Sequence, residues 1–170
     1  MKETFSNHLK EFVQAEAQGV FAFGVALGLA TSDPEWLSDI FSDFGSQFRA
    51  RAKQKGFIWE PMELKVLLYS VAWKHLKPLL SGQTFERFSL LGRDTRLVQK
   101  TETDLFQVSQ SDFQQEFVPR LGHLDLEQRV LIVLRDVLQF SDEEAMRVTD
   151  LRWGIYRHRL HRGRLELEAL

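Results

Sequence analysis

Cysteine is absent from this chain of 170 residues, which excludes disulfide bonds, thiolate metal sites and a cysteine nucleophile. Long apolar runs are missing too. The most apolar stretch, residues 20–30, has about half the length that a membrane-spanning helix needs, so it is better explained as a buried helix. The first residues mix both charges and lack a basic segment followed by an apolar core, so we expect no secretory signal. These absences predict a cytoplasmic protein without a membrane partner.

Motifs of catalysis and ligand binding are also missing. The sequence contains no glycine-rich phosphate loop, no dinucleotide-binding glycine pattern and no serine in a nucleophile elbow. The five histidines form no metalloprotease-type pair, and His158 and His161 lie among arginines that would repel a cation. We therefore expect no enzymatic activity, no cofactor and no metal site.

Apolar residues recur at helical spacing almost throughout the chain, and Asn-Gly or Asp-Gly hairpin turns are missing. An all-α fold is therefore predicted. We expect a first helix that runs to Ala30 and a second that begins at the capping box Ser32–Glu35 and carries an apolar stripe. A third helix is expected from Pro61, and Pro78 is expected to end it.

Composition divides the chain into three parts. Residues 81–120 are polar and rich in Gln, Ser, Thr and Asp, with scattered phenylalanines, unlike the helical patterns on either side. The sequence thus predicts two helical domains, residues 1–80 and 121–170, joined by a linker at residues 81–120.

The carboxyl-terminal part has the pattern of a helix-turn-helix unit. Apolar residues on one face predict a helix over residues 126–139, and a capping box of Ser141 and Glu144 begins a short second helix. A tight turn at residues 149–151 then leads into a final helix over residues 152–168. Two short helices joined by a short turn, the second one basic, are typical of proteins that read the major groove of DNA.

This final helix is basic although the chain as a whole has a net charge of −2. At 100° per residue, one sector of this helix is expected to pack on the preceding helices, and it contains Trp153, Tyr156, Leu160, Gly163 and Leu167. Acids follow only at Glu166 and Glu168, so we expect little ion pairing within the helix. Arginine suits phosphate and guanine contacts, so the outer face is predicted to bind DNA. The alternative is a solvated face whose arginines pair with nearby acids.

Four strings in the carboxyl-terminal part resemble the promoter-binding domain of bacterial RNA polymerase sigma factors, above all the small extracytoplasmic-function class. They are Leu124–Arg129, Leu134–Asp136, Ser141–Glu144 and Arg159–Arg164. The amino-terminal half is more weakly similar to the other domain of these factors. The resemblance implies a helix that binds the polymerase core, a further helix that binds the −10 element, and a final helix that reads the −35 element.

The resemblance also implies site residues and partners. DNA contacts would come from the −10 helix, which corresponds to Leu64–Leu80, and from the final helix, through Lys74, Lys77, Arg152, Ile155, Arg157, His158, Arg159, Arg162 and Arg164. Polymerase contacts would come from the helix that begins near residue 36, through Trp36, Leu37, Asp39, Ile40, Phe41 and Phe44. The implied partners are RNA polymerase core, promoter DNA and an anti-sigma protein.

Several positions depart from the family pattern. Asp150 stands where glycine is usual in the turn, and Ile155 stands where threonine is usual. The −10 helix lacks the usual arginines, and its Tyr69 and Trp73 either stack on an unpaired base or pack in the core. Two alternatives therefore stay open. One is a degenerate sigma-like protein that binds a protein partner without opening promoters, and the other is a plain helix-turn-helix regulator.

Overall fold

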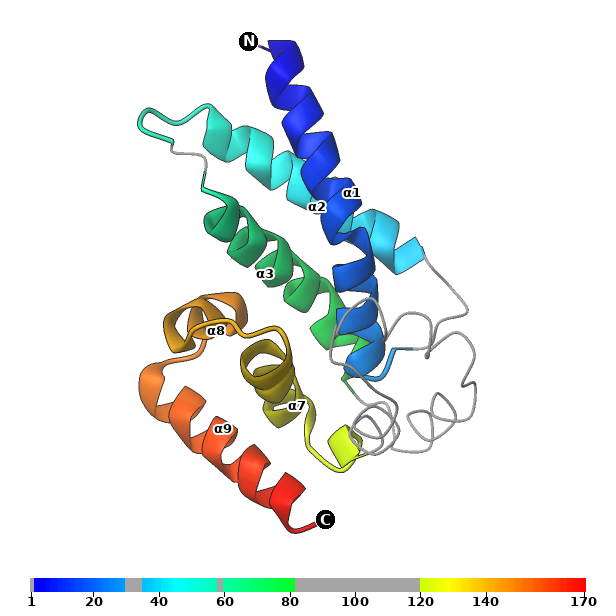
Figure 1. The fold of residues 1–170 in the computed structure, drawn as a ribbon, viewed down its shortest axis with the longest axis vertical. Coiled ribbons are helices and arrows are strands. Elements are labelled where there is room, and N and C mark those ends of the chain that lie inside the picture. Colours follow the sequence, from blue (N-terminus) through cyan, green and yellow to red (C-terminus); the bar gives the residue numbers. More distant parts are fainter. Residues whose placement is uncertain (1, 30–34, 58–59, 82–119) are drawn as a thin grey trace.

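A computed structural model describes residues 2–29, 35–57, 60–81 and 120–170 of the chain, and every regular element in these residues is helical. The all-α prediction is confirmed. In chain order the elements are α1 (Lys2–Ala26), α2 (Glu35–Ala52), α3 (Pro61–Leu80), α7 (Leu126–Ile132), the π-helical segment η1 (Val133–Val137), α8 (Asp142–Thr149) and α9 (Trp153–Glu168). Figure 1 shows α1, α2 and α3 as one group and α7, α8 and α9 as a second group along one side of α3. No described helix has the length and apolar character to cross a membrane.

The amino-terminal group is held by the apolar stripe of α2. Ile40, Phe44 and Phe48 repeat every fourth residue and are completely buried, as the periodicity predicts. Phe44 packs against Phe12 of α1 at a centroid distance of 5.8 Å. The helix begins at Glu35, and the rest of the predicted capping box lies outside the described residues.

Two predicted helix ends are wrong. The first helix ends at Ala26 rather than Ala30, because Gly28 takes a φ of 106° that only glycine adopts freely. The third helix continues past Pro78 to Leu80. Proline removes one hydrogen bond in the last turn, but the N–H of Ser81 still donates to the Lys77 carbonyl at 2.9 Å, and Leu80 is buried.

The helix-turn-helix unit matches its sequence pattern more closely. Ser141 and Glu144 form the predicted capping box, with the Glu144 N–H donating to Ser141 Oγ at 3.2 Å. Asp150 closes α8 in the left-handed region at φ 56°, which aspartate tolerates better than most residues. The predicted helix over residues 126–139 is α-helical only to Ile132 and continues as η1.

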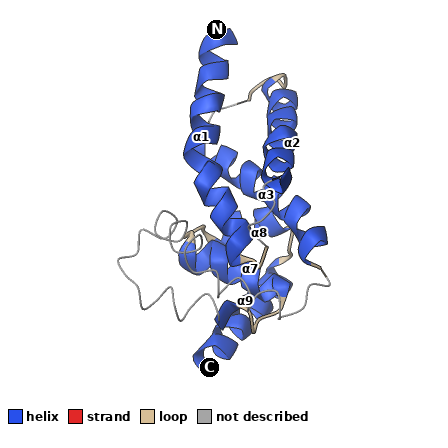
Figure 2. Ribbon diagram, turned by 90° about the vertical axis from the view of Figure 1, so that its right-hand side faces the viewer, coloured by secondary structure: helices blue, strands red, loops and turns tan. Residues whose placement is uncertain are grey.

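The two groups share one continuous hydrophobic core. Tyr69 of α3 packs edge-on against Phe140, which precedes α8, with ring centroids 5.3 Å apart. Arg147 of α8 donates two hydrogen bonds to Glu63 of α3, at 2.7 and 2.5 Å. Figure 2 shows α8 next to α3 in a view turned by 90°. Tyr69 and Trp73 are both buried, so the core interpretation of these two aromatic residues is confirmed.

Replacing Asp43 with asparagine should make the protein less sensitive to acid. Asp43 of α2 lies 3.0 Å from Nε2 of His75 on α3, and this hydrogen bond holds the pKa of Asp43 below its ordinary value of 3.8. The stabilisation is complete above pH 3.8 and is lost as the pH falls through the lower folded-state pKa. Because Asp43 is partly exposed, we expect a loss of about 0.2–1 kcal/mol at neutral pH.

Urea unfolding at several pH values measures this effect. The difference between the wild type and the Asp43→Asn variant should shrink below pH 3.8. Asp39→Asn, an exposed position on the same helix, is the control. A constant difference across the acid range would contradict the prediction.

Candidate nucleic-acid interface

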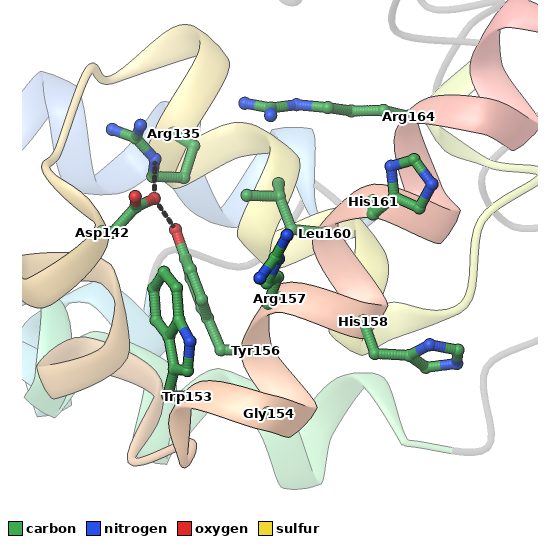
Figure 3. A pocket seen from close by; sticks show the side chains of 10 residues that line it. All are labelled: Arg135, Asp142, Trp153, Gly154, Tyr156, Arg157, His158, Leu160, His161 and Arg164. Atoms are coloured by element: carbon green, nitrogen blue, oxygen red, sulfur yellow. Dashed lines mark hydrogen bonds and ion pairs between the residues drawn. The ribbon is translucent and has the colours of Figure 1, made fainter.

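The orientation of α9 is fixed by one carboxylate. The hydroxyl of Tyr156 donates to Asp142 Oδ1 at 2.5 Å, and Arg135 Nε lies 2.7 Å from the same oxygen. Figure 3 shows this junction of η1, α8 and α9. Burial, and then the hydrogen bond to Asp142, raise the pKa of Tyr156 far above its ordinary value, so the hydroxyl stays protonated and remains a donor. These contacts therefore connect the start of α9 to α8 and η1.

The buried side of α9 is mostly as predicted. Tyr156, Leu160 and Gly163 are buried, and a Cβ at Gly163 would lie only 3.3 Å from Cβ of Gln128 on α7. Trp153 was expected in this seam, but 52% of it is exposed and its ring stacks on Tyr156 at 5.9 Å. Trp153 is the first residue of α9, and it rests on Tyr156 while about half of its surface stays in contact with solvent.

The arginines of α9 from residue 159 onward are paired with acids. Arg159 forms an ion pair with Glu127 of α7, and Arg164 binds Asp136 of η1 through two hydrogen bonds. Arg162 lies 3.3 Å from Glu166 on α9 itself. Arg162 and Glu166 are an exception to the expected lack of pairing within the helix, and the alternative interpretation of arginines paired with nearby acids fits all three residues, two of which pair with acids from other elements. Spacing along α9 cannot reveal them, because tertiary packing brings them close.

The cationic side chains at the start of α9 differ from these paired arginines. Arg152, Arg157 and His158 are exposed, and no described residue forms an ion pair with any of them. They adjoin the exposed apolar side chains of Trp153 and Ile155. This cationic end of α9 is where a groove-reading helix contacts base edges. We refer to residues 152–158 as the open end of α9.

An open hollow of about 560 Å³ lies beside the open end. Figure 3 shows its lining from η1, α8 and α9. The lining residues are Arg135, Asp142, Trp153, Gly154, Tyr156, Arg157, His158, Leu160, His161 and Arg164. Arginine and histidine account for half of them; Arg135 and Arg164 pair with Asp142 and Asp136, so Arg157 is the arginine of this lining that forms no ion pair with a described residue and is suited to an anionic group such as a phosphate. No group of acids, histidines or cysteines with metal-binding geometry occurs in the described residues.

The two lysines of α3 that are predicted to bind DNA lie in different surroundings. Lys74 is exposed, whereas Lys77 donates to Glu127 Oε1 at 3.0 Å and lies over the Trp73 ring. Glu127 therefore pairs with Lys77 from α3 and with Arg159 from α9. Glu127 lies within the string Leu124–Arg129 that resembles the sigma-factor pattern, but no sequence pattern indicated that it pairs with these cations.

The six residues predicted to bind polymerase divide into two sets. Ile40 and Phe44 are completely buried, and Trp36 is 8% exposed and stacks on Phe21 of α1. These three side chains build the core of the amino-terminal group. Leu37 and Phe41 are half-buried and Asp39 is exposed, so these three are available to a partner.

Comparison with known proteins gives one informative similarity. No protein-family model matches the chain, and no curated protein matches it. The fold is similar to that of the sigma factor RpoE in its complex with the anti-sigma factor NepR from Bartonella quintana. The TM-score is 0.53 at 22% sequence identity, and the similarity covers 98% of this chain and 96% of that chain. At this identity the likeness concerns the fold.

Proposed function

We propose that the chain is a sigma-factor-like transcription initiation protein, without enzymatic activity, that binds RNA polymerase core and promoter DNA. The observation that carries the proposal is the open end of α9. Arg152, Arg157 and His158 project there without ion-pair partners in the described residues, at the start of the helix that follows a helix-turn. A fold shared over nearly the whole chain with a sigma factor supports it.

The proposal assigns a role to each helical group. Residues 1–80 would bind polymerase core through the surface residues of α2 and the −10 element through Lys74 and Lys77 of α3. Residues 121–170 would bind the −35 element through α9, and residues 81–120 would link the two domains. The similar sigma factor was solved with an anti-sigma factor, and we infer that this chain also binds an anti-sigma protein. This function places the protein in the cytoplasm.

Run-off transcription tests the proposal. Purified full-length chain and core polymerase from the same organism are added to a pool of genomic DNA fragments, and transcript ends are sequenced. Specific initiation that requires the chain supports the proposal. The Arg152→Ala, Arg157→Ala double variant should lose initiation but still bind core, because both substitutions lie far along the chain from α2. Failure of both initiation and core binding would contradict the proposal.

A degenerate sigma-like protein is the second candidate, and one feature of α3 favours it. Tyr69 and Trp73 are buried, and the exposed Lys77 is paired with Glu127, so Lys74 is the exposed lysine in the second half of α3 that forms no ion pair with a described residue. Few cations are then available to hold an opened promoter. Core binding without initiation would favour this candidate, and DNA binding without core affinity would favour a plain regulator.

Replacing Glu127 with glutamine should raise the affinity for duplex DNA. The carboxylate of Glu127 pairs with Lys77 and Arg159, and DNA phosphates compete with it for both cations. Exposed ion pairs are worth about 0.2–1 kcal/mol, so we expect a gain of roughly two- to fivefold at low salt. Fluorescence anisotropy with labelled duplex measures it.

The matched control for this prediction is Glu11→Gln. It removes the same charge from α1, whose amino-terminal half lies far from α9 in Figure 1. An equal gain in both variants would show that only net charge matters, and no gain in either would show that Glu127 does not compete with DNA.

A further inference from the structure

One apolar side chain lies within the cationic face of α9. Ile155 is 47% exposed, and His158 and Arg159 follow it by three and four residues. Residues at these spacings are neighbours on one face of a helix. Ile155 is also the third residue of α9, in its first turn. An apolar group therefore stands where a reading helix makes its base contacts.

Gly154, the residue before Ile155, has no side chain to cover the helix backbone. Gly154 is exposed, and a Cβ placed on it would meet no described atom within 4 Å. The backbone of the first turn is therefore uncovered beside Ile155. A second surface can approach Ile155 closely there, without displacing a neighbouring side chain.

The chemistry of Ile155 restricts what it can contact in DNA. Its side chain can neither donate nor accept a hydrogen bond, so packing it on a polar base edge would leave that edge unpaired. In the major groove, the C5-methyl group of thymine is the apolar feature that a base pair presents. An isoleucine at the reading end of a helix is suited to that group.

We infer that Ile155 is a specificity-determining residue that packs against the C5-methyl group of a thymine in the DNA element read by α9. The inference rests on the proposed function and names one base, a thymine, that α9 would recognise in its DNA element. Arg157 and His158 supply the neighbouring polar contacts to phosphate or guanine. The element should then contain a thymine whose replacement by cytosine or uracil weakens binding.

Deoxyuridine substitution tests the inference directly, because uracil differs from thymine in duplex DNA only by the missing methyl group. Binding sites are first selected from a random duplex library with the full chain. Each thymine of the selected site is then replaced by deoxyuridine, and affinities are measured by anisotropy. At one position the wild type should lose about fourfold in affinity, the loss expected for one buried methyl group.

Two variants separate this contact from general effects. Ile155→Ala should bind the thymine and deoxyuridine duplexes equally at that position. Leu165→Ala removes a similarly exposed apolar side chain from the last turns of α9 and should keep the fourfold preference.

The outcomes distinguish this inference from the proposed function. A defined selected sequence whose affinity changes at no position on deoxyuridine substitution overturns the inference and leaves the proposed function standing. A preference for thymine that persists in Ile155→Ala also overturns it. Failure to select any sequence overturns the inference and the DNA-binding part of the proposed function together.

Discussion

Replacing Phe140 with alanine should lower the free energy of unfolding by about 3–5 kcal/mol, the usual cost of removing a buried aromatic ring. Phe140 is 2% exposed, and its ring packs against Tyr69 of α3, with the Lys65 ammonium 5.9 Å from its centroid. It lies between η1 and α8, so the lost contacts join the two helical groups. Chemical denaturation followed by circular dichroism measures the change.

Phe140→Leu is the matched control, because it keeps most of the apolar volume and should cost less than about 1.5 kcal/mol. Tryptophan fluorescence adds a second readout, since Trp73 belongs to α3 and Trp153 to α9. If Phe140→Ala changed stability by less than the leucine variant, the packing of α3 on the carboxyl-terminal helices would not be part of the stable fold.

The double variant Arg152→Ala, Arg157→Ala should weaken duplex DNA binding by about tenfold or more at 0.1 M salt. Each lost phosphate contact also lowers the slope of log affinity against log salt by about 0.9, so we expect a slope change approaching 2. Both arginines are exposed and form no ion pair with a described residue, so they are free to meet phosphates. Titrations at several salt concentrations measure affinity and slope together.

Arg162→Ala, Arg164→Ala removes the same charge from the same helix and is the control. These two arginines already pair with Glu166 and Asp136, so the salt slope should change less. Equal slopes for the two double variants would mean that DNA does not favour the open end of α9.

Local signals in the sequence predicted the helix-turn-helix unit well. The capping box of Ser141 and Glu144 depends on neighbours within four residues and is present as predicted, and the turn after α8 is present with Asp150 in the left-handed region. The buried side of α9 also follows from helical periodicity at Tyr156 and Leu160. Such features need no knowledge of the rest of the fold.

Features that depend on tertiary contacts were not predictable in this way. Trp153 fits the helical period of the seam but is half-exposed, because its ring lies on Tyr156 at the open hollow. Asp136 and Glu127 lie more than twenty residues before the arginines that they pair with. The available cations of the candidate site therefore became clear only from the packing of α7 and η1 against α9.

The pairing of Lys77 and Arg159 with one carboxylate has a consequence for the length of DNA that one molecule can bind. Elements named −10 and −35 are separated by about 25 base pairs, or roughly 85 Å along the duplex. Side chains that meet at Glu127 cannot reach both at once. If the proposed function holds, α3 must separate from α7 and α8 before both elements are bound. The smaller the fraction of molecules in this separated, extended form, the weaker the apparent affinity for a complete promoter.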